Sequence, residues 1–312
     1  MKGAGKGRES NRERQSSFRS LAFLLLIPLA AFGLYHAATS VLDVAGVGSS
    51  QLPAIPERGP ADTTPKGTRK GSPEGKNPTE RSSTAAAQER RAGDKRIVLI
   101  LDDVGFGGQP LEEATRIDPN LNFAVIPGES HSRQSARTLE AGGFEILCHL
   151  PMEPLGYPGV SPGNRAILNA MTNDQIRAQV KENFRLVPEA RGFNNHMGSR
   201  GTADRRIMEQ VFAAMPPDLF FVDSRTTSAS LAGGVAREMN IRTASRDVFL
   251  DDKQDQQSIR KQLAELASLA EKRKLAIGIG HMYPSTIKVL SEEMPKLRQR
   301  GFRFIRASEA VN

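Results

Sequence analysis

Five short apolar runs in the last two thirds of the chain each end in a polar residue of the kind that binds metals or transfers protons. The runs are Ile97–Asp103, Phe144–His149, Gly192–His196, Leu219–Asp223 and Leu275–His281. If they are parallel strands, their carboxyl ends lie at one edge of the sheet, where α/β proteins place their active sites. The pattern therefore predicts a single site built from residues far apart in the chain: Asp102, Asp103, His149, His196, Asp223 and His281.

The segments between these runs favour a parallel α/β architecture. We predict strands at Arg96–Leu101, Leu121–Ile126, Phe144–Cys148, Gly192–Asn194, Leu219–Val222, Ile241–Thr243, Leu275–Ile279 and Phe302–Ile305. Helical periodicity is clearest in Thr172–Leu186, Ala203–Met215, Gln257–Lys274 and Thr286–Gln299, with Thr202 and Ser285 as the expected N-caps of the second and fourth. Alternating strands and helices indicate a parallel sheet, and about seven or eight repeats favour a barrel.

The N-terminal region has a different composition. Residues 1–20 are basic, and an apolar stretch over residues 21–38 follows them. This order is typical of a membrane-targeting segment whose basic side stays in the cytoplasm. Its length fits an uncleaved anchor, while the small residues at 37–40 fit a cleaved signal. Both interpretations place the rest of the chain on the periplasmic or extracytoplasmic side.

Residues 39–95 are rich in Pro, Gly, Ser, Thr and charged residues, so we expect a disordered linker. Much of the net charge of +8 lies before the folded region, and no nucleic-acid motif accompanies it, so we expect no nucleic-acid partner. The single cysteine, Cys148, excludes an intrachain disulfide and a Cys-rich zinc site, and is expected in the core. Residues 96–312 are enough for one folded domain.

Two of the motifs contain carboxylates suited to metal chemistry. Asp102 and Asp103 are adjacent at a strand end, so one can bind a metal while the other reaches a water or a partner group. We assign Asp103 as the ligand and Asp102 as the base. His149 is followed four residues later by Glu153, and because Pro151 argues against a helix, the two meet only if the loop folds back. Imidazole plus carboxylate suits zinc or a similar divalent ion.

The segment after Gly192 offers a further ligand. His196 is able to complete a ligand set, and the amides of Asn194 and Asn195 are suited to orient it or the substrate. An Asn/Gly turn with an exposed histidine is the alternative.

The remaining polar residues have less specific roles. Asp223 could orient a base, pair with Arg225 or form a simple cap. His281 is a candidate general acid, because an unperturbed imidazole titrates near pH 6.5. His131 and the Asp251–Asp252 pair are expected on the solvated surface.

Taken together, the motifs resemble those of the divergent polysaccharide deacetylase family, over about residues 96–308. They are Leu-Asp-Asp-Val-Gly, His-Leu-Pro-Met-Glu-Pro, Asn-Asn-His-Met-Gly-Ser and Ile-Gly-His. The family is distantly related to deacetylases that act on chitin-like and peptidoglycan sugars. The resemblance implies a distorted (β/α) barrel of about seven strands.

The main deacetylase family uses an Asp-Asp pair, with the first as base and the second on the metal, and a His-x-x-x-His pair of ligands. Asp102 and Asp103 match the first motif, and His149 matches the first histidine. Glu153 stands where the second histidine would be, so Glu153 and His196 both remain open as the third ligand. The resemblance makes His281 the general acid.

The implied function is hydrolysis of N-acetyl groups on an envelope polysaccharide or related glycan. A divalent metal, zinc by expectation, would lie on Asp103, His149 and His196 and polarise the amide oxygen. Asp102 would take a proton from water and His281 would give one to the leaving amine.

Two alternatives stay open. A non-catalytic glycan- or protein-binding envelope module that keeps the fold is favoured by Glu153 at a ligand position and opposed by the retained acid and base residues. A metal hydrolase of another class, such as a phosphoesterase, would use the same ligands, with Arg200 and Arg225 as the visible candidates for a phosphate clamp.

Overall fold

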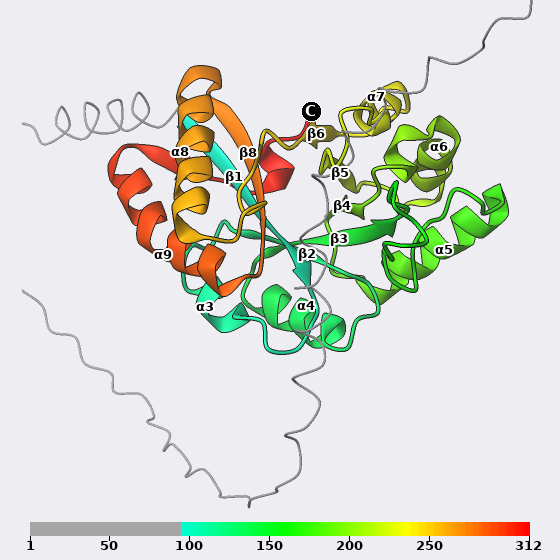
Figure 1. The fold of residues 1–312 in the computed structure, drawn as a ribbon, viewed down its shortest axis with the longest axis horizontal. Coiled ribbons are helices and arrows are strands. Elements are labelled where there is room, and N and C mark those ends of the chain that lie inside the picture. The colour runs from blue at the N-terminus through cyan, green and yellow to red at the C-terminus, as the bar shows by residue number, and fades with distance from the viewer. Residues whose placement is uncertain (1–94) are drawn as a thin grey trace, which may run out of the picture. The chain divides into compact units, whose positions relative to one another are not determined.

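The computed structural model describes residues 95–312 as a curled parallel sheet with helices packed on its outer face (Figure 1). The strands are β1 (Lys95–Val104), β2 (Asn122–Val125), β3 (Glu145–Met152), β4 (Gly192–Met197), β5 (Phe220–Asp223), β6 (Thr243–Ser245), β7 (Val248–Phe249), β8 (Leu275–His281) and β9 (Phe302–Phe304). Their order is β6-β5-β4-β3-β2-β1-β8-β7, with β9 also paired to β1. Every ladder is parallel.

Both faces of this sheet are buried. This is why successive residues in the strands are hydrophobic, instead of alternating between hydrophobic and polar. In β1, Leu99 and Leu101 face the helices, whereas Val98 and Ile100 face the inside of the curl. The inner face is filled by similar rows from the neighbouring strands, including Ile277 and Ile279 of β8 and Leu147 of β3. The strands are therefore held between two apolar layers.

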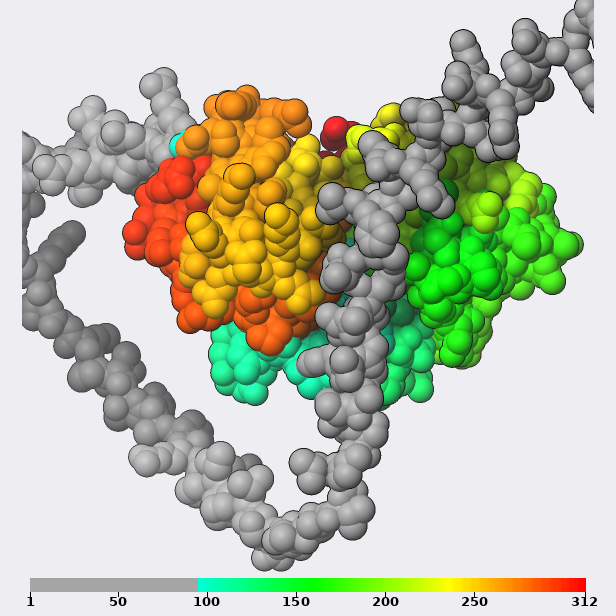
Figure 2. Space-filling model, in the orientation of Figure 1, coloured from blue at the N-terminus to red at the C-terminus, as the bar shows by residue number. Residues whose placement is uncertain are grey.

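Seven α-helices lie along the described residues. They are α3 (Leu111–Thr115), α4 (Ser132–Ala141), α5 (Asn173–Leu186), α6 (Arg205–Ala214), α7 (Ala232–Glu238), α8 (Gln256–Arg273) and α9 (Pro284–Gln299). The pairs α8–α9 and α5–α6 form opposite flanks of this domain (Figures 1 and 2). The helix α5 begins at a capping box, in which Thr172 and Gln175 exchange hydrogen bonds through side chain and backbone.

The C-terminal segment crosses the amino-terminal ends of the strands. After β9, the backbone N–H of Ala307 donates to Asn122 at the start of β2, and that of Ser308 donates to Glu145 at the start of β3. The carbonyl of Asn312 then accepts from the N–H of Thr243 at the start of β6, at 3.0 Å. This segment closes one end of the curled sheet, so the opposite, carboxyl end is left for a site.

The structure confirms the parallel α/β architecture, as an open half-barrel of nine strands, where eight strand segments were predicted and the resemblance implied about seven. The additional short strand β7 was not predicted. Two N-caps were wrong: Asp204 caps α6 by accepting from the N–H of Ile207, and Tyr283 precedes α9. Thr202 instead donates its hydroxyl to the carbonyl of Gly198, and Pro284 starts α9 because its fixed φ suits a first helical turn.

Among residues 95–312, no helix is both long and apolar enough to cross a bilayer. The predicted basic segment 1–20, the membrane segment 21–38 and the linker up to residue 94 lie outside the described residues.

Candidate metal and acid–base site

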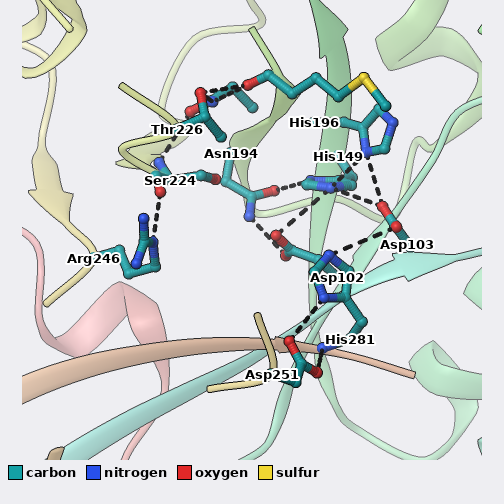
Figure 3. A network of polar contacts seen from close by, with 12 residues as sticks. Asp102, Asp103, His149, Asn194, His196, Ser224, Thr226, Arg246, Asp251 and His281 are labelled. Carbon is teal, nitrogen blue, oxygen red and sulfur yellow. Dashed lines mark hydrogen bonds and ion pairs between the residues drawn. The ribbon is translucent and has the colours of Figure 1, made fainter. Parts of the chain in front are cut away.

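Three potential metal ligands converge at the carboxyl ends of β1, β3 and β4 (Figure 3). The Oδ1 atom of Asp103 lies 2.8 Å from Nδ1 of His196 and 3.1 Å from Nε2 of His149. The same two imidazole nitrogens lie 3.2 Å from each other. All three donor atoms therefore fall within the space that one ion would occupy, each coming from a different strand.

The register of the sheet brings these side chains together. His149 of β3 lies opposite Asn194 of β4, and Asp102 of β1 lies opposite His281 of β8. Because neighbours in a parallel ladder point to the same face, all four continue the inward-facing apolar rows of their strands. The polar residues thus follow the inward-facing residues of their strands toward the carboxyl end of the sheet.

Asp103 reaches the same site by a different route. As the residue after Asp102, it would point outward in a regular strand, but its φ of 60° turns the chain into the left-handed region. Met197, directly after His196, also has a positive φ, of 52°. Such conformations cost a non-glycine residue about 1 kcal/mol or more, and they are concentrated at functional sites.

The donor set fits a divalent metal ion. Oδ1 of Asp103 is buried and accepts no well-directed hydrogen bond, although two imidazole nitrogens lie close to it. A buried carboxylate oxygen without a directed partner is costly, and an ion among the three ligands would remove that cost. Two imidazoles and one carboxylate with room for further ligands is a common zinc set, although other first-row ions accept it.

The charges within the cluster support one another. Burial alone would raise the pKa of Asp103, but the imidazoles of His196 and His149 hold it well below its usual range. Burial would likewise lower the pKa of His149, but the carboxylates of Asp102 and Asp103 raise it. Without an ion, a proton on His149 is therefore stabilised by these carboxylates, and metal binding at that imidazole must displace it.

Asn194 connects the proposed base to a ligand. Its Nδ2 donates to Oδ1 of Asp102 at 2.8 Å, and its Oδ1 lies 2.7 Å from Nδ1 of His149. Because a carboxylate only accepts, the amide nitrogen must face Asp102, and its oxygen is left to accept from Nδ1–H. This leaves Nε2 of His149 free toward Asp103 and an ion. Burial raises the pKa of Asp102, although its charged neighbours partly oppose this.

His281 is held by a residue that we expected on the surface. Asp251 is fully buried and accepts from the backbone N–H of His281 at 2.6 Å, from its Nδ1 at 2.9 Å and from the hydroxyl of Thr286 at 2.7 Å. The solvated position predicted for Asp251 was wrong. Burial lowers the pKa of His281, but the bond to Asp251 and the charge of Asp103 raise it to about 9. The other ring nitrogen, Nε2, lies 3.7 Å from Asp103.

Glu153 lies apart from the cluster. β3 stays extended as far as Met152, so Glu153 is about 13 Å along the strand from His149, at roughly 3.3 Å per residue. Its carboxylate accepts from Arg200 at 2.9 Å and from the backbone N–H of Asn169 at 2.7 Å. Of the two residues left open as the third ligand, the structure groups His196, not Glu153, with Asp103 and His149.

Three further predicted residues shape the strand ends without adding donors to the cluster. Asn195 accepts from the N–H of Ser224 at 2.9 Å and so ties β4 to the end of β5. Asp223 accepts from the N–H of Arg225 and the hydroxyl of Ser230, both at 2.8 Å. The Asp223–Arg225 contact is therefore a backbone cap, and the Arg225 side chain is exposed.

Sequence reasoning missed Arg246 and Asp251. Arg246 donates to the carbonyl of Ser224 at 2.6 Å (Figure 3) and to that of Arg225 at 2.9 Å. Its guanidinium lies 4.8 Å from the ring centre of Phe249. Nothing in the local sequence marks it. Asp251 does follow an apolar run, Val248–Leu250, so it shows the signal of the other motifs in a shorter form.

The fold and the site together define a parallel α/β half-barrel protein with a metal-type Asp/His cluster at its strand ends. A family model described as divergent polysaccharide deacetylase matches residues 99–311, and the chain belongs to that family.

Known relatives extend over most of the same region. The chain is 32% identical over 216 residues to an uncharacterized protein of Haemophilus influenzae, covering 69% of this chain and 76% of that protein. It is 30% identical over 218 residues to the uncharacterized protein YibQ of Escherichia coli, covering 70% and 67%. The crystal structure of an uncharacterized protein from Agrobacterium tumefaciens C58 shares the fold, with a TM-score of 0.67, 22% identity and coverage of 72% and 94%.

Proposed function

We propose that this protein is a metal-dependent hydrolase that removes N-acetyl groups from an envelope polysaccharide or related glycan. The observation that carries the proposal is the convergence of Asp103, His149 and His196 beside a buried carboxylate, Asp102, and a carboxylate-paired histidine, His281. Membership of the deacetylase family supports a glycan substrate.

Asp102 is suited to accept a proton from the attacking water. A divalent ion on Asp103, His149 and His196, zinc by our proposal, would act as a Lewis acid on the amide oxygen and acidify water. Asn194 fixes the Asp102 carboxylate by a hydrogen bond to one oxygen, which leaves the other free for the proton. Burial raises the pKa of Asp102 toward the range in which a base works efficiently near neutral pH.

His281 is suited to protonate the leaving amine. Asp251 holds Nδ1 and so directs Nε2 toward the cluster. A paired histidine keeps its proton at neutral pH, which a general acid requires. Asp251 acts on the reaction through His281 and is a positioning residue.

We further propose that residues 21–38 anchor or export the chain, with the folded domain on the periplasmic or extracytoplasmic side. The basic residues 1–20, the apolar segment and the linker composition support this placement. This placement is tested by fusing a reporter after residue 94. A reporter that works only outside the cytoplasm is expected to be active there, and activity of a reporter that works only in the cytoplasm would reject the placement.

The metal site is tested by loading the full-length chain with zinc and measuring bound metal after dialysis. We expect about one equivalent per chain, lost in His149→Ala and in His196→Ala. His131→Ala is the matched control, because His131 is an exposed histidine. Acetate release from chitin oligosaccharides and peptidoglycan fragments then tests the reaction. Failure to bind stoichiometric metal would reject the proposal.

The feature that favoured the binding-module alternative carries less weight. Glu153 is engaged by Arg200 and Asn169, and the cluster has its third donor in His196. Arg200 is engaged by the same contact, which also weakens the phosphate-clamp reading. Stoichiometric metal and retained glycan binding without acetate release would support the binding module.

A further inference from the structure

A cavity of about 370 Å³ lies beside the candidate site, between the segment after β2 and the segment that joins β3 to α5. Its lining includes Glu129, Pro151, Asn164, Arg165 and Gln179. The volume is within the range of roughly 300–1,000 Å³ that is typical of small-molecule pockets. The cavity is therefore large enough to take a ligand group of its own.

This cavity lies near the candidate site. Pro151 lies two residues beyond His149 in the same inward row of β3, a step of about 6.6 Å. Glu129 lies against the end of β1: a Cβ placed on Gly105 would be 3.4 Å from the Cβ of Glu129. Gly105 follows Asp103 by two residues. A ligand long enough to cross the ends of β1 and β3 would thus reach from the Asp103–His149–His196 cluster to the cavity.

The polar lining suits an uncharged, hydroxyl-rich group. Arg165 and Glu129 bring opposite charges, while Asn164 and Gln179 bring amides that both donate and accept. An anion would be repelled by the Glu129 carboxylate, and a cation would be repelled by the Arg165 guanidinium. Sugar hydroxyls donate and accept at once, so they match the whole set.

Arg165 is held in place before any ligand arrives. Its side chain lies across Gly128, where a Cβ would come within 2.3 Å of Nε, and Gly128 has a φ of 83°. Glycine is needed there both for the close approach and for the backbone conformation. The Arg165 guanidinium also lies 3.7 Å from Glu182 of α5. A donor fixed in this way loses less entropy on binding.

The segment that borders the cavity also exposes apolar side chains. Leu155, Tyr157 and Val160 are 69%, 37% and 38% exposed, and they precede the lining residues Asn164 and Arg165. A group of exposed apolar side chains often marks a ligand-binding surface. Aromatic and aliphatic side chains here would suit the apolar C–H faces of a sugar ring.

We propose that this cavity and residues 155–165 form a saccharide subsite for the sugar next to the one whose acetyl group lies at Asp103, His149 and His196. The proposal rests on the proposed function and narrows it: the substrate is an oligosaccharide chain, neutral at the neighbouring sugar. It predicts that affinity rises from a single sugar to an oligomer.

The test compares binding of N-acetylglucosamine and of its chitin oligomers to the zinc-loaded full-length chain by calorimetry. Arg165→Ala is expected to weaken oligomer binding about tenfold, the effect of losing roughly 1.4 kcal/mol, and to leave single-sugar binding unchanged. Gln179→Ala is a second variant, in case Arg165→Ala fails to fold. Arg177→Ala is the matched control on the same helix, since Arg177 pairs with Asp174 and Gln210 away from the cavity lining.

The outcomes separate this proposal from the hydrolase proposal. Selective loss of oligomer binding in the cavity variants supports the subsite even if the wild type releases no acetate. The absence of acetate release would reject only the hydrolase proposal. Acetate release with equal affinity for monomer and oligomer, or unchanged oligomer binding in both variants, rejects the subsite alone. No sugar binding by the wild type, an equal loss in Arg177→Ala, or tighter binding of an oligomer with a carboxylate on the neighbouring sugar would each overturn the subsite as stated.

Discussion

Replacing Asp251 by asparagine tests whether this buried carboxylate sustains the charge of His281. The substitution keeps the size of the side chain and removes its negative charge. Asp251 is fully buried and accepts three hydrogen bonds, two of them from His281. We expect the fold to persist, because the volume is conserved, and the pKa of His281 to fall from about 9 toward its ordinary value of 6.5.

The magnitude follows from the same contacts. A pKa of about 9 in the folded chain and 6.5 in the unfolded chain corresponds to about 3 kcal/mol of stability, shared among Asp251, Asp103 and Asp102. The hydrogen bond to Asp251 is the largest contribution that raises the pKa, and a charge-assisted bond is worth about 1.5–3 kcal/mol. Since the folded pKa is raised, this stability is complete below pH 6.5 and is lost as the pH rises through about 9.

The assay is urea unfolding of the metal-free chain in a chelator, near pH 6 and near pH 10, for wild type and Asp251→Asn. The loss of unfolding free energy is expected to be about 2 kcal/mol greater near pH 6 than near pH 10. Asp252→Asn is the matched control, because the neighbouring aspartate is exposed. Histidine resonances followed by NMR give the pKa of His281 directly. An unchanged His281 pKa, or a loss equal at both pH values, would refute the reasoning.

Three more predictions test the surroundings of the site. Asn194→Leu should lower the free energy of unfolding by about 1–3 kcal/mol, because it leaves Asp102 and Nδ1 of His149 without their buried partner, and urea unfolding measures this; an unchanged stability would contradict the network. Glu153→Ala should destabilise the fold by about 1.5–3 kcal/mol, since Glu153 anchors Arg200 and the loop at Asn169, and should leave metal stoichiometry intact; loss of metal would instead show that Glu153 is a ligand. Cys148 should resist a thiol reagent in the native chain and react in urea, because it is fully buried and burial raises the pKa of its thiol; rapid native labelling would show that β3 opens.

Much of the site could be predicted because the apolar run in several strands is followed by a polar residue near the carboxyl end of the strand. That local pattern marked Asp102, His149 and His281, and the parallel register then brought them together. The choice between Glu153 and His196 could not be made from spacing. The choice depends on whether β3 continues straight past His149. Pairing with β4 keeps β3 extended as far as Met152.

The residues that sequence reasoning missed have partners that lie far along the chain. Asp251 is buried because β8 and the start of α9 pack over it, and its hydrogen-bond partners are 30 and 35 residues away. Arg246 is placed by carbonyls 21 and 22 residues earlier. A polar residue in a polar stretch gives no local sign of such burial, so the short run before Asp251 was too weak a signal.

The pairing of β1 with β8 also determines when the domain can become complete. As the chain is synthesised, β1 meets β2 early, but its other long edge stays open until residues 275–281 have emerged. Until then the long apolar strand β1 exposes unpaired backbone groups along that edge, which favours association with other chains. Asp102 and its register partner His281 are made near opposite ends of the domain, so the candidate acid–base pair is assembled only after nearly the whole polypeptide has been produced. A partly made chain is therefore vulnerable to aggregation and lacks the candidate site.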